Sequence, residues 1–412
     1  IRMRYSIFIF TFYLLNPFSS TEANNNYPII LIHGFIGWGP EEMGGYNYWG
    51  GNYDYVEYLD SLGYEVYNVS VGPISSNWDC AVEAYYQIKG GQVDYGKRHS
   101  TQYGIIQKPS SKKWPGLYPE WDADHPIHII GHSMGGQTAR RLQYLLETEI
   151  YVDSARTIPE SSDLLGQKHQ NWIRSITTMS SPHNGTTLSD IVTKSVPFLQ
   201  DFIGLAAVIG NRFYSFDLEQ WGFKKNNEES WSRYFTRIRS HPAWGTNNFC
   251  SWDMSLEGAR QLNTVAVANK NIFYFSFATS NTHLDSLSGK HVPNKDMSLI
   301  LRPNAHAMGK QIDYWADSTS IDSTWFENDG IVNTISMIGP TTGLNGSDQI
   351  IEYQVNEVLV PGSWYYMGKL TMDHRTLMGH GEISNEVLNN ILLLFKEHAD
   401  RLYALPPIIN IY

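Results

Sequence analysis

The amino-acid sequence predicts an α/β fold built on a mostly parallel, doubly wound β-sheet. Short, continuously apolar segments, typical of strands buried on both faces, alternate with segments whose apolar residues recur at helical spacing. Strands that alternate with helices form a parallel sheet covered on both faces. No repeat, low-complexity tract or proline-rich linker interrupts residues 24–412, so we expect a single domain there.

Five strands and four helices can be placed along the chain. The expected strands are runs rich in Ile, Val, Tyr and Phe: residues 28–33, 64–69, 126–130, 173–179 and 272–277. The expected helices carry apolar side chains three or four residues apart: residues 55–62, 79–88, 136–147 and 386–398.

A serine lies in the sharp turn between the third strand and the helix after it. Residues 131–135 read Gly-His-Ser-Met-Gly. A serine between a strand and a helix in this pattern is the nucleophile elbow of α/β-hydrolases. Gly131 and Gly135 lack side chains that would hold strand and helix apart. Ser133 is therefore the predicted nucleophile, and the alternative is an ordinary buried serine in a turn.

Serine chemistry on this fold also needs an acid and then a histidine later in the chain. The histidine follows the last strand and precedes the final helix, which leaves His374 and His380. The aspartates in the preceding window are Asp313, Asp317, Asp322, Asp329 and Asp348. The motif alone decides neither choice, although the Asp-Gly pair at 329–330 suits a tight turn.

Two backbone N–H groups are expected to stabilise an oxyanion. One belongs to Met134, the residue after the nucleophile, and the other to Phe35, in the His-Gly-Phe sequence after the first strand. The alternative is that His33 and Phe35 are only core residues.

Several longer segments resemble the secreted lipases of the thermoalkalophilic and staphylococcal Gram-positive group. They are residues 29–43, 48–51, 71–79, 90–96, 131–140, 181–187, 217–222 and 327–334. The resemblance runs in register from about Tyr27 to His374. It implies an α/β-hydrolase fold with a helical lid insertion and a small inserted subdomain. It also implies a catalytic triad of Ser133, Asp329 and His374, so His380 is no longer a candidate for the triad histidine.

The family's zinc site is only partly retained. Zinc is held there by two aspartates and two histidines, and the matching positions are Asp79, His99, Ile105 and Glu219. Isoleucine cannot bind a metal, and three ligands with one nitrogen make a weak zinc site. We therefore expect a degraded site, with structural zinc left open.

The family's calcium site is depleted as well. Its backbone carbonyl matches Gly289, but its two carboxylate positions read Thr376 and Gly381, which leaves Glu382 as the nearby acid. Calcium takes six to eight oxygen ligands, so calcium dependence is not expected. No cofactor is expected for catalysis itself.

Two further segments bear on location and mechanism. Residues 1–23 are predicted to be a signal peptide, because Arg2 and Arg4 precede an apolar stretch too short to span a bilayer; the alternative is a signal anchor. The apolar segment Ser195–Ile209 is a core helix or an amphipathic lid, and the resemblance favours the lid.

Composition limits the possible binding partners and covalent modifications. The net charge of −11 argues against nucleic acid and against docking on anionic membranes by charge alone. Cys80 and Cys250 are the only cysteines, and they allow either one disulfide or two buried thiols. Asn345, in an Asn-Gly-Ser sequon, is the site where we expect a glycan in a eukaryotic host. We expect a monomer without a transmembrane segment.

These observations together predict a secreted triacylglycerol lipase that acts at an oil–water interface through an acyl-serine intermediate. The alternatives within the enzyme class are a short-chain carboxylesterase, a phospholipase and a lipid acyltransferase. The alternative from another class is an inactive hydrolase-like binding protein, against which the intact set of Ser133, Asp329 and His374 argues.

Overall fold

A computed structural model describes residues 25–40, 42–188, 219–223 and 228–407. The predicted signal peptide, residues 1–23, and the predicted lid, residues 195–209, lie outside the described residues.

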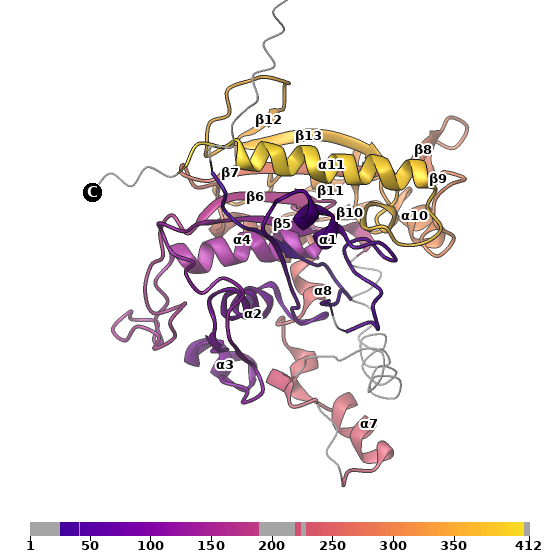
Figure 1. The fold of residues 1–412 in the computed structure, drawn as a ribbon. Helices are drawn as coiled ribbons and strands as arrows, with labels where there is room; N and C mark the ends of the chain where they lie inside the picture. The colour runs from indigo at the N-terminus through magenta and orange to yellow at the C-terminus, as the bar shows by residue number, and fades with distance from the viewer. Residues whose placement is uncertain (1–24, 41, 189–218, 224–227, 408–412) are drawn as a thin grey trace, which may run out of the picture.

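A seven-stranded sheet forms the centre of the described chain (Figure 1). Its strand order is β12-β13-β7-β6-β5-β1-β2, and every neighbouring pair is parallel. The strands are β1 Ile29–Ile32, β2 Val66–Val69, β5 Ile127–His132, β6 Ile173–Met179, β7 Phe273–Ser280, β12 Ile350–Glu352 and β13 Trp364–Thr371. The predicted α/β class and parallel sheet are thus confirmed, and the five expected strands correspond to β1, β2, β5, β6 and β7.

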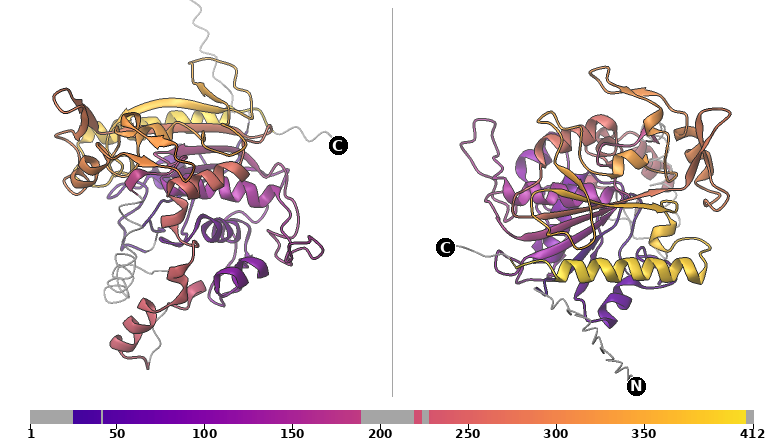
Figure 2. Two further views of the ribbon diagram at one scale, coloured as in Figure 1. Left: turned by 180° about the vertical axis from the view of Figure 1, so that it is seen from behind. Right: turned by 90° about the horizontal axis from the view of Figure 1, so that it is seen from above.

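Helices cover both faces of this sheet (Figures 1 and 2). The helices are α1 Tyr55–Ser61, α2 Asn77–Lys89, α3 Lys97–Tyr103, α4 Met134–Glu147, α7 Trp231–Arg239, α8 Cys250–Asp253, α9 Leu256–Val265, α10 Arg302–Met308 and α11 Asn385–Tyr403. The four expected helices are α1, α2, α4 and α11. In both figures α3 and α7 lie on the α2 side, farther from the sheet.

Short two-stranded sheets lie outside the central one. They are β3 Gly91–Gln92 with β4 Lys113–Trp114, β8 Thr282–Asp285 with β9 Lys290–Pro293, and β10 Asp313–Tyr314 with β11 Ser320–Ile321. The β3–β4 pair and α3 belong to the chain between α2 and β5.

The apolar core is divided between the two faces of the sheet. Along β1, Ile30 and Ile32 pack into the cluster that includes α2 and α4, whereas Ile29 and Leu31 pack into the cluster that includes α1 and α11. This alternation follows from the two-residue period of a strand. Because both faces are covered, all four residues are buried, which explains why the strand reads as continuously apolar.

The two cysteines do not form a disulfide in this structure. Cys80 and Cys250 are free, buried thiols. Among the described residues, no helix is both long and apolar enough to span a membrane.

Candidate active site

Ser133 lies at the apex of the turn from β5 into α4. Its backbone has φ 56° and ψ −129°, a conformation that is strained for a residue with a side chain. Its N–H donates a hydrogen bond to the carbonyl oxygen of Met179 in β6, at 2.8 Å. The turn is therefore anchored to the neighbouring strand.

The two glycines around Ser133 are required by close packing. A Cβ on Gly131 would lie 2.4 Å from the backbone of Gly135, and a Cβ on Gly135 would lie 2.1 Å from the carbonyl oxygen of Ile32. Any side chain at either position would push α4 away from the sheet. This is the geometry expected of a nucleophile elbow.

Asp329 and His374 form a hydrogen-bonded pair. His374 Nδ1 lies 2.7 Å from Asp329 Oδ2, and the His374 N–H donates to the Asp329 carbonyl oxygen at 3.1 Å. The second carboxylate oxygen accepts the N–H groups of Ile331 at 3.0 Å and Val332 at 2.8 Å. Asp329 therefore acts as an acceptor on both oxygens, which places a proton on His374 Nδ1 and leaves Nε2 as the basic nitrogen.

Thr279, at the end of β7, also supports this carboxylate. Its hydroxyl donates to Asp329 Oδ2 at 2.7 Å and lies 2.8 Å from the hydroxyl of Ser180. A lone threonine in a strand gives no recognisable signal, so this role of Thr279 could not be predicted from the sequence.

The aspartates that competed with Asp329 are used elsewhere. Asp317 pairs with Arg260 at 2.6 Å, Asp322 caps the 3-10 helix Ser323–Trp325, and Asp348 accepts the indole N–H of Trp364 at 3.2 Å. Asp313 accepts the N–H of Tyr314 at 2.8 Å.

His380 has a different environment from His374. Its Nε2 donates to the Tyr48 carbonyl oxygen at 2.8 Å, and its ring stacks on Trp38 with centroids 5.3 Å apart. Burial lowers the pKa of His380 to about 4. Among the described residues no carboxylate orients this ring, so it lacks the partner a triad histidine needs.

The loop that follows β1 lies directly beside Ser133. A Cβ on Gly34 would come within 2.6 Å of the Ser133 Cβ. The Gly34 N–H donates to the Tyr48 hydroxyl at 2.9 Å, and the Ile36 N–H donates to the Pro73 carbonyl oxygen at 2.9 Å. Between these two anchors, the N–H of Phe35 has no acceptor among the described residues, and the same is true of the N–H of Met134.

His33 fixes the start of this loop. Its Nε2 accepts the Val71 N–H at 3.0 Å, so its Nδ1 carries the proton and donates to the Gly34 carbonyl oxygen at 2.9 Å. Burial lowers the pKa of His33 to about 4, which keeps the ring neutral near pH 7.

A second buried histidine, His132, connects the loop after β1 with the Asp329–His374 pair. The Tyr48 hydroxyl, which accepts from Gly34, lies 2.7 Å from His132 Nδ1 and donates to it. The His132 ring centroid lies 4.6 Å from that of His374, and burial lowers the pKa of His132 well below its ordinary value. His132 directly precedes Ser133 in the chain, and its ring contacts both Tyr48 and His374. Ser133, the Asp329–His374 pair and the loop at Gly34 therefore lie at the same end of the sheet.

The His374 loop is held by the preceding residue. Asp373 is fully buried, and its carboxylate accepts four hydrogen bonds: from the N–H groups of Ser298, Arg375 and Thr376 and from the Thr376 hydroxyl, at 2.7–3.0 Å. Ser298 is 75 residues away in the chain, so this contact could not be predicted from the sequence.

The residues at the family's calcium positions do not hold the His374 loop in the way that Asp373 does. Gly289 lies in the turn between β8 and β9, and Glu382 is exposed before α11. Thr376 bonds to Asp373 instead of supplying a carboxylate.

Two of the zinc positions, Asp79 and His99, form a hydrogen-bonded pair. His99 Nε2 lies 2.8 Å from Asp79 Oδ1, and the Asn248 amide donates to Asp79 Oδ2 at 3.0 Å. The His99 ring stacks on Trp78, with centroids 4.8 Å apart. Ile105 is buried in the adjoining apolar cluster. Among the described residues, no group of three or more His, Cys, Asp or Glu side chains is arranged to hold a metal ion.

Comparison with known proteins agrees with this geometry. Residues 25–354 match the family model described as "Lipase-like, C-terminal domain". Lipase 2 of Staphylococcus aureus (strain MRSA252) is 34% identical over 332 residues, which cover 78% of this chain and 46% of that protein. The chain thus spans about half the length of the curated relatives it matches.

Two solved structures are also similar. EstA from Clostridium botulinum has a TM-score of 0.82 and 36% identity and covers 95% of this chain and 90% of its own. Staphylococcus hyicus lipase has a TM-score of 0.80 and 31% identity and covers 92% of this chain and 97% of its own.

Proposed function

Because this chain belongs to the family of the lipase-like C-terminal domain, we propose that it is a secreted triacylglycerol lipase that hydrolyses the carboxylic esters of acylglycerols. The observation that carries the proposal is the strained Ser133 turn, in which the ring of the preceding residue, His132, lies 4.6 Å from that of His374 in the buried Asp329–His374 pair. A serine, an oriented imidazole and a buried carboxylate in this chain order are the parts of an acyl-transfer site.

The proposed reaction proceeds in two halves. Ser133 Oγ attacks the ester carbonyl carbon while His374 Nε2 takes its proton, and Asp329 stabilises the imidazolium that forms. His374 then returns the proton to the oxygen of the departing alcohol, which leaves an acyl-serine. Water, deprotonated by the same imidazole, attacks this ester and releases the fatty acid.

The tetrahedral intermediates in both halves carry a negative oxygen. We assign its stabilisation to the Phe35 and Met134 N–H groups, which have no acceptor among the described residues. Donors already held in place need no reorganisation as charge develops, and losing one typically costs ~10²–10³ in rate. The anchors of the loop, His33 and Tyr48, would keep the Phe35 N–H in position.

The decisive assay compares two substrates. Wild type, Ser133→Ala and the exposed-surface control Ser232→Ala are tested on emulsified long-chain triacylglycerol and on a dissolved short-chain ester. We expect Ser133→Ala to lose both activities by ~10⁶, the usual cost of removing a nucleophile, and Ser232→Ala to retain both. Turnover of the short ester alone by wild type would indicate a carboxylesterase. No turnover of any ester would favour the binding-protein alternative.

Secretion is part of the proposal and is tested separately. Residues 1–23 are fused to a reporter enzyme that has no export signal of its own. Export with cleavage near residue 23 supports a signal peptide, whereas a reporter that stays membrane-bound supports the signal anchor.

A further inference from the structure

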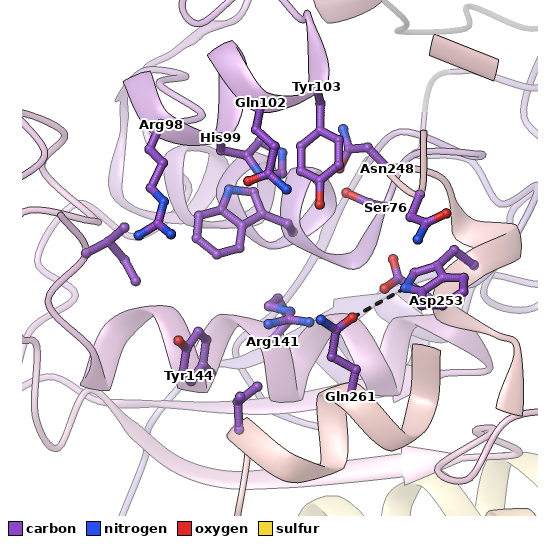
Figure 3. Close-up of a pocket in the computed structure, with 15 residues that line it drawn as sticks. Ser76, Arg98, His99, Gln102, Tyr103, Arg141, Tyr144, Asn248, Asp253 and Gln261 are labelled. Carbon is purple, nitrogen blue, oxygen red and sulfur yellow. Dashed lines mark hydrogen bonds between the residues drawn. The ribbon is translucent and has the colours of Figure 1, made fainter. Parts of the chain in front are cut away.

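A cavity lies along α4, away from Ser133 (Figure 3). Its volume is about 530 Å³, it is open to solvent on one side, and side chains from α3, α4, α8 and α9 line it. Ser133 does not line it, and Arg141, on its floor, is eight residues further along α4, about 12 Å at the rise of an α-helix. We propose that this cavity binds a small hydroxylated ligand that carries a phosphate or carboxylate group, held between Arg98 and Arg141.

Arg141 is the central observation. Its Nε is buried without a hydrogen-bond partner, and among the described residues its guanidinium makes no hydrogen bond or ion pair. The guanidinium carbon lies 5.5 Å from the centre of the Tyr144 ring, and the guanidinium also interacts electrostatically with the Asp253 carboxylate. The Nε atom is therefore a buried donor without an acceptor, which costs free energy, and a bound anion would supply the acceptor.

Arg98 is the second cation at the cavity. Figure 3 shows Arg98, Gln102 and Tyr103 extending from α3 into the space that Arg141 faces from α4. Within the described part of the chain, the Arg98 guanidinium also has no carboxylate or carbonyl partner. Guanidinium groups present paired N–H donors that match the two oxygens of a phosphate or carboxylate.

One carboxylate also faces the cavity. Asp253 Oδ2 accepts the Asn77 N–H at 2.6 Å, and burial raises the pKa of Asp253 to about 6, against the opposing effect of Arg141. In Figure 3, Asp253 and Asn248 lie at the opposite end from Arg98, with Arg141 between. His99, which also lines the cavity, is already paired with Asp79. The end near Arg98 is therefore the cationic end.

The other side chains that line the cavity fit a ligand larger than an inorganic ion. The Gln261 Oε1 accepts the Trp252 indole N–H at 3.4 Å, which leaves the amide NH₂ as a donor toward the cavity. Together with Gln102 and Tyr103, it offers hydrogen bonds to hydroxyl groups. A volume of about 530 Å³ is in the range of small-molecule sites and larger than inorganic phosphate needs.

The test is calorimetric titration of the full chain at low ionic strength with four probes. Glycerol 3-phosphate and citrate carry the proposed anionic groups, glycerophosphocholine represents a lipid headgroup with a phosphodiester, and glycerol is the neutral control. We expect saturable one-to-one binding of at least one of the two anions and none of glycerol. Tighter binding of glycerol 3-phosphate than of glycerophosphocholine would identify a free phosphate ester as the ligand type, and the reverse order would identify a lipid headgroup.

Three variants locate the binding site. Arg141→Gln should weaken anion affinity by at least about tenfold, the usual effect of losing a charge-assisted hydrogen bond, and Arg98→Gln should weaken it less. Arg233→Gln, an exposed change on α7, should leave affinity unchanged. Protein whose Ser133 has been blocked with an organophosphonate should bind as the untreated protein does, which separates this cavity from the proposed active site.

Two results would overturn the proposal. One is the absence of saturable binding for every anionic probe. The other is unaltered affinity in folded Arg141→Gln, checked by its thermal unfolding. If Arg141→Gln does not fold, unaltered affinity in Arg98→Gln overturns the proposal instead.

Discussion

The Asp373 carboxylate accepts the backbone N–H of Ser298 at 2.7 Å, and this single contact joins the loop that carries His374 to a segment 75 residues earlier in the chain. The same carboxylate also accepts the N–H groups of Arg375 and Thr376, immediately after His374. A buried carboxylate in this position orders the loop that carries His374 through hydrogen bonds.

Replacing Asp373 should therefore damage catalysis through the position of His374. Asp373→Ala leaves several N–H groups without an acceptor, each worth roughly 1–3 kcal/mol when buried. We expect a lower melting temperature and a kcat reduced by at least about tenfold, with KM changed little. Steady-state kinetics and thermal unfolding measure both, with the exposed Asp296→Asn as the control. A variant that is fully active but less stable would show that Asp373 supports only the fold.

Much of the site could be predicted because its residues are adjacent in the chain or carry a recognised pattern. The Gly-His-Ser-Met-Gly sequence between an apolar run and a helical segment defines the turn at Ser133, and the structure agrees on both flanking elements. The choice of Asp329 over the other aspartates needed the family resemblance, because the sequence has no other signal for which carboxylate reaches His374. Its catalytic role remains a prediction.

The parts that were missed depend on long-range contacts or broken patterns. Strand β13 was not placed, because its side chains are only partly buried and its register shifts between Tyr366 and Lys369. A short edge strand such as β12 has equally little pattern to detect. Thr279 and Asp373 are single polar residues whose partners are distant in the chain, so neither the spacing nor the composition indicates them.

Metal removal should have little effect on this protein. Asp79, His99, Ile105 and Glu219 stand at the positions where the resemblance places zinc. Asp79 is hydrogen-bonded to His99 and to the Asn248 amide, and Ile105 is buried among apolar side chains. We expect treatment with a chelator to change neither ester hydrolysis nor the melting temperature, and elemental analysis to find well under one zinc or calcium per chain. Loss of stability on chelation, reversed by adding one of these metals, would contradict this expectation.

Stability should fall as the pH drops below neutral, and His33 should account for part of the fall. Burial lowers the pKa of His33 from 6.5 to about 4, so the unfolded chain binds a proton in this range that the folded chain does not. The free energy of unfolding is therefore highest above pH 6.5 and falls by ~1.4 kcal/mol per pH unit for this one group as the pH drops toward 4.

His33→Gln tests this assignment, because glutamine offers a donor and an acceptor but does not titrate. Urea unfolding between pH 5 and pH 7 should show a shallower pH dependence for His33→Gln than for wild type, by about 2 kcal/mol over this range. The exposed His306→Gln should retain the wild-type slope. Equal slopes in His33→Gln and wild type would mean that His33 is not held neutral in the folded protein.

Tyr48 should affect the rate of catalysis more than substrate binding. Its hydroxyl accepts the Gly34 N–H and donates to His132 Nδ1, so it connects the loop bearing the Phe35 N–H with the ring packed against His374. Tyr48→Phe removes both hydrogen bonds, keeps the aromatic packing and leaves the buried Gly34 N–H without its acceptor, at a cost of roughly 1–3 kcal/mol. If part of that cost falls on the oxyanion donors, kcat on a dissolved ester drops by about tenfold while KM stays nearly constant.

Kinetics of Tyr48→Phe beside the exposed Tyr53→Phe measure this, with melting temperatures recorded for both. A rise in KM at unchanged kcat would place Tyr48 in substrate binding, and a loss of stability with intact kinetics would limit it to the core.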